Sequence, residues 1–171
     1  FKNAIKQSPE NAMARFLLGQ TYLQTYSSSA AVIELEKAQS LGFSDGDTEL
    51  TLGKAYAQLQ QDDNILNNIS SQSGFSATAN AEIHAIRALS LFRKDQSTAA
   101  KKELDEARKL DETATGVRLS WASYEQSFKN TEAQKSWLKP LLDKNGGVAD
   151  AWSQMAELEK NAGNLKVAEE Y

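Results

Sequence analysis

Apolar residues recur along this chain at helical spacing, and one group of them is repeated at a nearly constant interval. In most copies a small residue follows a bulky one, and another large residue comes three positions later, so that all of them share one helix face. The small residues are Gly19, Gly53, Ala88, Ala122 and Ala156. They are separated by 34, 35, 34 and 34 residues, the period of a helix-turn-helix unit. The pattern predicts an all-α chain of stacked hairpins.

A second helix in each unit is indicated by alanines spaced between leucines. In the first unit these positions are Ala31, Leu35, Ala38 and Leu41. In the third unit they are Ala100, Leu104, Ala107 and Leu110. Small side chains let two antiparallel helices approach closely, which predicts close-approach points at Gly19, Gly53, Ala31 and Ala100. A single hairpin cannot bury both of its apolar faces, so each is expected to pack on a neighbour.

Together these positions resemble the tetratricopeptide repeat family. The fifth unit strengthens the resemblance with Ala149, Ala151, Trp152, Met155, Ala156, Gly163 and Ala168, including the tryptophan of the family motif. The resemblance covers essentially the whole chain. It implies a right-handed α-solenoid of antiparallel helix-turn-helix hairpins with about five repeats.

The same register predicts that residues 1–171 form a single solenoid segment, which divides into repeats. Phe1, Ala4 and Pro9 fall where the family places a second-helix aromatic residue, an alanine and a closing proline. We therefore assign residues 1–9 to the end of a preceding repeat. The repeats that follow are predicted over residues 12–43, 46–80, 81–114, 115–148 and 149–171, the last of them truncated within a second helix.

Local signals mark several helix ends. Ser8 before Pro9 has the sequence of a helix N-cap followed by proline at the first helical position, where the missing amide hydrogen costs nothing. Gly42, the pair Gly146-Gly147, and Gly163 are predicted to end helices in the left-handed conformation.

Two units depart from the regular pattern. In the second, Ile65 stands where alanine is expected, and residues 70–80 are rich in Ser, Gly and Ala, which predicts a short second helix followed by a loop. In the fourth, Ala133 is one residue early and Pro140 falls within the second helix. Because proline removes the backbone hydrogen bond to Ser136, we expect the helix to bend or end near Pro140.

Charge and composition limit the classes of partner. The formal net charge is −4 and the pI is about 5.1, whereas nucleic-acid binders need a basic face that displaces counterions. No apolar run approaches the roughly 20 residues that span a bilayer, so this segment is not expected to insert into a membrane. The absence of cysteine excludes disulfides and thiolate metal sites, and it fits a reducing cytosol and a bacterial envelope alike.

A narrower resemblance favours the envelope. Residues 1–5 (FKNAI) and 14–19 (ARFLLG), the pair Tyr22-Leu23 and the irregular second repeat are similar to the tetratricopeptide lipoproteins of bacterial exosortase (PEP-CTERM) exopolysaccharide systems. That resemblance implies a periplasmic protein whose lipid anchor lies upstream of this segment, with a role in exopolysaccharide or protein export assembly. The residues present do not carry an anchor signal themselves.

Candidate chemistry is sparse. His84 is the only histidine and stands where the motif places tryptophan, so packing is favoured over metal or acid/base work. Trp121, Trp137 and Trp152 are interpreted as core residues rather than a ligand-stacking set. The segment 101–109 mixes both signs of charge and is interpreted as a solvated helix face with paired charges. With no phosphate loop, nucleophile elbow or zinc-helix motif, we predict no enzymatic activity, no cofactor and no metal.

The family resemblance implies a concave groove built by the first helices. Its positions map to Phe16, Gln20, Leu23, Leu50, Lys54, Gln58, Leu89, Phe92, Arg93, Leu119 and Ser123. Phe16 and Gln20 replace the lysine and asparagine of family members that clamp a terminal carboxylate, so no such clamp is expected. One interpretation is a peptide or helical segment anchored on Phe16, Leu50, Leu89 and Phe92, with Lys54 and Arg93 orienting acidic groups. The other is that these side chains only pack adjacent repeats.

The predicted function is therefore a protein-protein interaction scaffold that binds its partner in the groove. The alternative is a structural or self-associating spacer in an envelope complex, in which exposed end repeats dock on neighbouring copies. An enzyme is the least favoured of the three classes, because His84 is its only candidate residue. The partner itself is not identified by the sequence.

Overall fold

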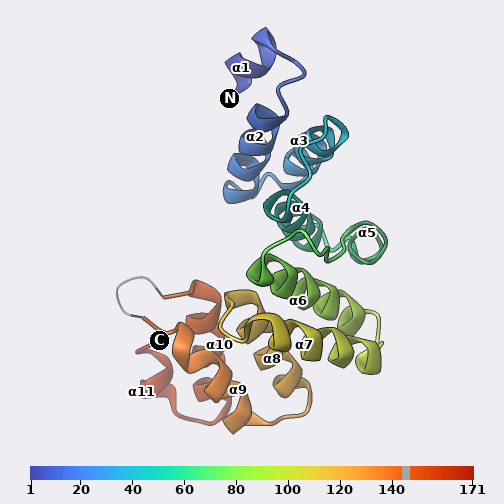
Figure 1. Cartoon of the computed structure of the whole chain (residues 1–171). Coiled ribbons are helices and arrows are strands. Elements are labelled where there is room, and N and C mark those ends of the chain that lie inside the picture. Colours follow the sequence, from blue (N-terminus) through green and yellow to red (C-terminus); the bar gives the residue numbers. More distant parts are fainter. Residues whose placement is uncertain (144–146) are drawn as a thin grey trace. The chain divides into compact units, whose positions relative to one another are not determined.

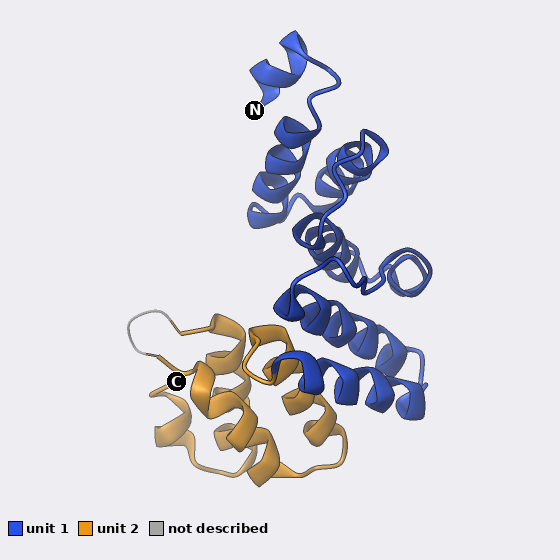
Figure 2. Ribbon diagram, in the orientation of Figure 1, with its two compact units in different colours: residues 1–111 blue, residues 112–171 orange. Residues whose placement is uncertain are grey.

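A computed structural model describes residues 1–143 and 147–171, and all regular secondary structure in these residues is helical. The chain divides into two compact units, residues 1–111 and 112–171 (Figure 2). The prediction of an all-α protein is confirmed.

Helices follow one another along the chain with short connections (Figure 1). Unit 1 contains α1 (Lys2–Gln7), α2 (Ala12–Gln24), α3 (Ser28–Ser40), α4 (Gly46–Gln58), α5 (Asp62–Asn68), α6 (Ala77–Arg93) and α7 (Ser97–Asp111). Unit 2 contains α8 (Thr115–Ser127), α9 (Thr131–Leu138), the 3-10 helix η1 (Lys139–Leu141), α10 (Ala149–Asn161) and α11 (Leu165–Ala168).

Consecutive helices pair as hairpins: α2 with α3, α4 with α5 and α6 with α7 in unit 1, and α8 with α9 and α10 with α11 in unit 2. The first helices of unit 1 also contact one another in succession, α2 with α4 and α4 with α6. Helix starts at residues 12, 46, 115 and 149 coincide with the predicted repeat starts. That the two units form one continuous solenoid stays a prediction.

The turn inside each hairpin has the same backbone form. It contains one residue in the left-handed region, Tyr26, Gln60, Asp95, Lys129 or Gly163, with φ between +55° and +82°. The residue after it donates its backbone N–H to the carbonyl five positions earlier, at 2.8 to 3.0 Å, which is the closing bond of a Schellman motif. These residues are 34, 35, 34 and 34 positions apart. The period seen in the side chains is therefore also present in the backbone.

Close approach between paired helices is confirmed in unit 1. A Cβ atom added to Gly19 would lie 2.6 Å from Leu35 Cγ, and one added to Gly53 would lie 3.3 Å from Ile69 Cγ2. Ala31 and Ala100 are fully buried on the second helices. Since close-packed interiors leave no room for added atoms, the small residues at these points determine how near the helices lie.

The core of unit 2 is smaller and more aromatic. Trp121 and Trp137 stack with ring centroids 5.5 Å apart, beside a buried cluster that includes Leu138 and Met155. Trp152 lies against Tyr171 at 5.6 Å. The three tryptophans are thus packing residues, as predicted, and they do not form one stacking set.

Both irregular repeats contain short second helices. The predicted short helix after Gln60 is α5, with 7 residues, and Ile65 is fully buried within it. In the fourth repeat α9 ends at Leu138, and Pro140 lies in the 3-10 turn that follows. The expected break at Pro140 is confirmed, because its nitrogen has no hydrogen to continue the α-helical pattern.

Two boundary predictions need correction. The N-cap of α2 is Asn11, whose Oδ1 accepts from Ala14 N at 2.9 Å, whereas Ser8 closes α1. The third repeat begins with α6 at Ala77 rather than at residue 81, because Ser76 caps that helix and alanines favour its first turn.

The predicted glycine stops have different outcomes. Gly42 and Gly163 follow the ends of α3 and α10 with φ of +87° and +82°, as predicted. Gly146 lies outside the described residues. Gly147 follows η1 and its connection, so it does not end a helix directly.

None of the helices in residues 1–143 and 147–171 combines the length and apolar character needed to cross a bilayer.

Candidate functional site

The predicted groove residues fall in both units, so the two sets are treated separately. In unit 1 they lie on α2, α4 and α6, and in unit 2 Leu119 and Ser123 lie on α8. The positions that remain at least partly accessible on unit 1 are Gln20, Leu23, Leu50, Lys54, Gln58, Leu89, Phe92 and Arg93. Because α2, α4 and α6 contact one another in succession, these side chains belong to neighbouring helices. We call them the first-helix surface.

Phe16 is the exception. Its side chain is only 7% exposed and its ring packs on Phe43, with centroids 5.1 Å apart. It belongs to the same buried cluster as Leu35 and Leu52. The interpretation of Phe16 as an anchor for a partner is therefore corrected, because its apolar surface is already covered by the chain itself.

The two predicted cationic residues have acidic partners within unit 1. Lys54 Nζ lies 3.8 Å from the carboxylate of the largely buried Glu82. The guanidinium of Arg93 donates hydrogen bonds to the Asp62 carboxylate. Arg93 Nε lies 2.9 and 3.0 Å from the two carboxylate oxygens. The hydrogen bond and charge of Arg93 hold the pKa of Asp62 below its usual value. Arg93 thus fastens the start of α5 to the end of α6, and it would have to leave Asp62 to bind a partner's carboxylate.

The remaining polar positions are engaged locally. Gln58 Oε1 accepts from the hydroxyl of Ser28, which joins the end of α4 to the start of α3. On α8, Ser123 Oγ donates to the Leu119 carbonyl at 3.0 Å, and Leu119 packs against the unit 2 core. Packing therefore accounts fully for Phe16. Leu23 and Leu50 pack against the unit 1 core as Leu119 packs against that of unit 2, and these three and Leu89 are half-buried, so each keeps part of its surface accessible.

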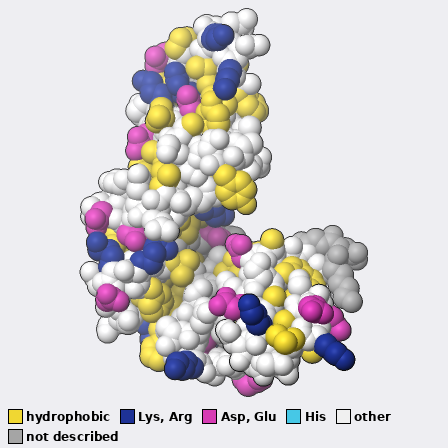
Figure 3. Space-filling model, turned by 180° about the vertical axis from the view of Figure 1, so that it is seen from behind, with side chains coloured by type: hydrophobic (Ala, Val, Ile, Leu, Met, Phe, Trp, Pro, Cys, Tyr) yellow, Lys and Arg dark blue, Asp and Glu magenta, His cyan; other side chains and the backbone are white. Residues whose placement is uncertain are grey.

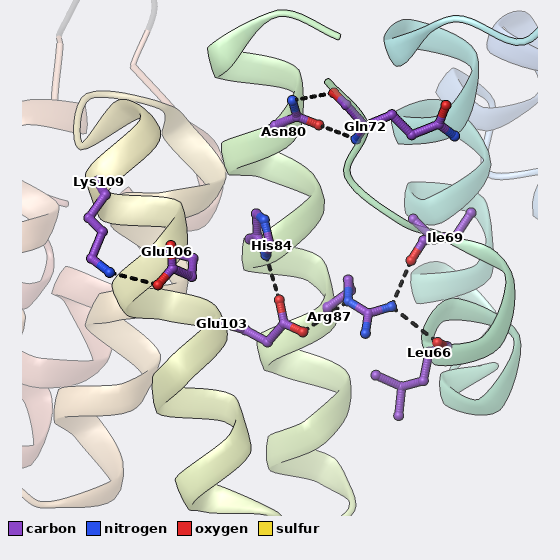
Figure 4. Close-up of polar contacts among 9 residues, drawn as sticks. All are labelled: Leu66, Ile69, Gln72, Asn80, His84, Arg87, Glu103, Glu106 and Lys109. Atoms are coloured by element: carbon purple, nitrogen blue, oxygen red, sulfur yellow. Dashed lines mark hydrogen bonds and ion pairs between the residues drawn. The ribbon is translucent and has the colours of Figure 1, made fainter. Parts of the chain in front are cut away.

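His84 lies in a polar network between helices (Figure 4). Its Nδ1 is 2.5 Å from Glu103 Oε2 on α7, and Arg87 Nε is 3.1 Å from Glu103 Oε1. Arg87 also donates to the carbonyls of Leu66 and Ile69, at 3.1 and 2.7 Å. The network joins α6 to α7 and to the end of α5.

Glu103 is the central group of this network. Burial raises its pKa, but the hydrogen bond from His84 and the charge of Arg87 outweigh burial, so that the pKa lies below its usual value. Other charges on α7 pair at the surface, such as Lys101 with Asp105 at 2.7 Å. The charged segment is thus a solvated face as predicted, except at Glu103. Within the described residues no group of three or more metal-binding side chains comes together.

A cleft opens in unit 2, where the turn between α8 and α9 approaches α10. Its cavity volume is about 390 Å³, and its lining surface is more apolar than polar. Leu158, Ala162 and Thr131 contribute to the lining, together with four amide side chains: Gln126, Gln134, Gln154 and Asn161. Lys129 and Glu157 add one charge of each sign. We call this the amide cleft.

Sequence reasoning missed the amide cleft because it noted that Ala133 is one residue early without asking which residue occupies the regular position. Ala133 is only half-buried, whereas Gln134 is 2% exposed. Gln134 stands twelve residues after Ala122, and the same interval separates Gly19 from Ala31 and Ala88 from Ala100. That constant interval was the signal that could have identified Gln134 as the buried residue.

Charged side chains of both signs are interspersed on the face drawn in Figure 3, without a large basic area.

No protein-family model matches this chain, and no curated protein is similar to it.

Proposed function

We propose that this chain is a tetratricopeptide-type array that works as a protein-interaction scaffold. The repeated hairpin supports the family: the left-handed turn residue and its closing hydrogen bond recur at the interval of the side-chain motif. In this proposal the hairpins stack as a right-handed α-solenoid. The first helices then form the inner, partner-binding side.

The observation that carries the binding role is the first-helix surface. Leu23, Leu50 and Leu89 lie on helices that contact one another in succession, yet all three keep accessible apolar surface. Apolar side chains at successive positions can anchor an extended or helical segment. The charged members of this surface, Lys54 and Arg93, are paired with Glu82 and Asp62. The proposed partner therefore relies on apolar anchors more than on ion pairs.

The test uses peptides selected from a random-sequence display library against the full chain, followed by calorimetric titration. A Leu50→Ser/Leu89→Ser double variant is expected to weaken the selected peptides by about tenfold or more, since each serine removes buried apolar contact. Ile33→Ser is the matched control, because Ile33 is 64% exposed on the second helix α3. Its binding should equal that of the unchanged chain.

The result that contradicts the proposal is equal affinity in the double variant, provided that its circular dichroism and melting curve match the unchanged chain. Light scattering over a concentration series separates the spacer alternative, because a self-associating chain gains mass with concentration in the absence of any peptide.

A further inference from the structure

A pocket lies at the turn of the first hairpin in unit 1. Residues 26–30, from that turn and the start of α3, line it together with Gln58 and Leu59 at the end of α4. Its cavity volume is about 670 Å³, which is within the usual range of ligand sites. The lining residues are all uncharged, and their surface is more apolar than polar. We call this the Tyr26 pocket.

The repeat itself does not require an aromatic residue at Tyr26. Tyr26 is the left-handed residue of its turn, with φ of +56°, and it is 85% exposed. The equivalent turn residues of the other hairpins are polar residues or glycine: Gln60, Asp95, Lys129 and Gly163. A bulky residue in this backbone region is strained, and strained residues cluster at functional sites. Since the exposed ring adds little to the core, its presence is better explained by binding than by folding.

The backbone of the turn holds Tyr26 in a defined place. Tyr26 N donates to the Leu23 carbonyl at 3.1 Å, and Ser27 N donates to the Tyr22 carbonyl at 2.8 Å. A tyrosine side chain has only two rotatable torsions. Little conformational entropy is therefore lost when a ligand packs on the ring.

A buried serine orients the amide of Gln58. Ser28 is 7% exposed, and its hydroxyl donates to Gln58 Oε1. The NH2 group of Gln58 and the exposed Ser29 hydroxyl form no hydrogen bond within the part of the chain that the structure describes. The pocket thus combines an oriented amide and an accessible hydroxyl with the apolar surface of Tyr26 and Leu59.

Sugars match this combination of groups. A pyranose ring has an apolar face of C–H groups, which can pack on an aromatic ring, and a rim of hydroxyls, which donate and accept hydrogen bonds. The Gln58 NH2 group can donate to a sugar oxygen, and Ser29 Oγ can donate or accept. Because the lining residues are uncharged, a charged ligand would gain no ion pair in the pocket.

We propose that the Tyr26 pocket binds a neutral oligosaccharide, with one sugar ring stacked on Tyr26 and its hydroxyls bonded to Gln58 and Ser29. This activity goes beyond the scaffold function and does not require it. The pocket shares Gln58 with the first-helix surface, while its other residues are separate from that surface. Variants can therefore distinguish the two sites.

The test exposes the full chain to an array of neutral and acidic oligosaccharides and measures the affinity of the neutral ones by NMR titration. Tyr26→Asn removes the ring but suits the left-handed backbone, because asparagine is often found there. Its melting temperature should equal or exceed that of the unchanged chain. Its affinity for the bound oligosaccharide should fall by about tenfold or more, whereas Tyr26→Phe, which keeps the ring, should retain most of the affinity.

Two further variants control this test. Phe128→Ala removes another exposed aromatic side chain next to a hairpin turn, in unit 2, and its oligosaccharide affinity should equal that of the unchanged chain. Gln58→Met keeps a similar length but removes the amide. Its oligosaccharide affinity should fall by about fivefold, because the hydrogen bond to the sugar is lost.

Several results would overturn the proposal. They are the absence of any neutral oligosaccharide that binds the unchanged chain, a stronger response to acidic than to neutral oligosaccharides, and equal oligosaccharide affinity in Tyr26→Asn. Loss of affinity for the library-selected peptides alone in Tyr26→Asn would identify the pocket as a protein contact and would also overturn it. Failure of the scaffold proposal looks different, since Leu50→Ser/Leu89→Ser should leave oligosaccharide binding unchanged.

Discussion

The α6–α7 hairpin and the α8–α9 hairpin use the same spacing but differ at one buried position. In each, an alanine of the first helix is fully buried, Ala88 or Ala122. Twelve residues later the first hairpin has Ala100, at 0% exposure, and the second has Gln134, at 2%. The second helices have 15 and 8 residues. Burial at this position thus follows from the repeat geometry, whatever the residue type.

The difference shows how a repeat protein can acquire a polar site without changing its fold. The alanine position supports close helix packing in α6–α7. The glutamine in α8–α9 accompanies a shorter helix, a 3-10 continuation at Pro140 and the amide cleft. The α6–α7 hairpin has a polar network around Glu103, whereas the α8–α9 hairpin buries the amide of Gln134. The predictions that follow test this contrast, from the largest effect to the smallest.

Placing glutamine at the alanine position of α7 should be the most damaging change. Ala100→Gln forces a long polar side chain into a fully buried site, and we expect a loss of about 3 kcal/mol in the free energy of unfolding, from overpacking and unpaired polar atoms. Urea denaturation measures the effect. Ala99→Gln is the control on the exposed side of α7, with an expected change within about 0.5 kcal/mol. If Ala100→Gln and Ala99→Gln change the free energy of unfolding equally, α7 accepts glutamine at its buried position as α9 does. The proposed difference between the two hairpins would then be contradicted.

Removing Arg87 should cost about 2 kcal/mol, because charged hydrogen bonds to two backbone carbonyls and to Glu103 are lost together. The variant is Arg87→Ala and the assay is again urea denaturation. Arg118→Ala is the counterpart in α8, where the guanidinium reaches a carbonyl only at 3.4 Å. Its effect should be much smaller. Similar losses would mean that the network adds nothing particular to the α6–α7 hairpin.

Acid should weaken the network through Glu103, with a smaller effect than Arg87→Ala. The folded pKa of Glu103 lies below its usual value of 4.5, so its stabilisation is fully present above that value. It is lost as the pH falls through the folded pKa, because the unfolded chain binds the proton more readily. Unfolding free energies measured from neutral to acidic pH should fall more steeply for the unchanged chain than for Glu103→Gln. Parallel curves would contradict this role.

The smallest effects are expected in the hairpin turns, where glycine and a residue with a side chain can be compared at the same left-handed backbone position. Gly163→Ala should lose about 1 kcal/mol, since a Cβ atom is disfavoured at φ of +82°. Lys129→Gly, at φ of +57° in the α8–α9 turn, should gain about 0.5 kcal/mol, because relief of the left-handed strain exceeds the added entropy of the unfolded chain. Thermal melting resolves both signs. If the melting temperature moves in the same direction in both variants, the two turns are not equivalent.

Much of the fold could be predicted from spacing alone. Helix starts at residues 12, 46, 115 and 149 and the close approach at Gly19 follow from the repeated small residues. The turn residues could not be found by residue type, because Tyr26, Gln60 and Lys129 are not residues that favour the left-handed region, although Asp95 is of a type enriched there. Their left-handed conformation is imposed by the helices on either side. In the sequence only the constant repeat spacing indicates where such a turn lies.

Less of the candidate site could be predicted. The first-helix positions were identified by register, but the register does not tell which of them the core covers, as with Phe16 beneath Phe43. Nor could it show that Arg93 is held by Asp62, because the two residues are far apart in sequence and meet only when α5 packs on α6. The amide cleft is lined by Gln134 and Gln154, and nothing in residue type shows that Gln134 is buried while Gln154 is only half-buried.

The central claim is that this chain binds a partner through its first helices, and amide chemical-shift mapping tests it most directly. The ¹⁵N-labelled chain is titrated with a library-selected peptide, and backbone and glutamine side-chain resonances are followed. The account predicts shifts on α2, α4 and α6 around Leu50 and Leu89. Shifts confined to the second helices, such as the exposed face of α3 around Ile33, would contradict it.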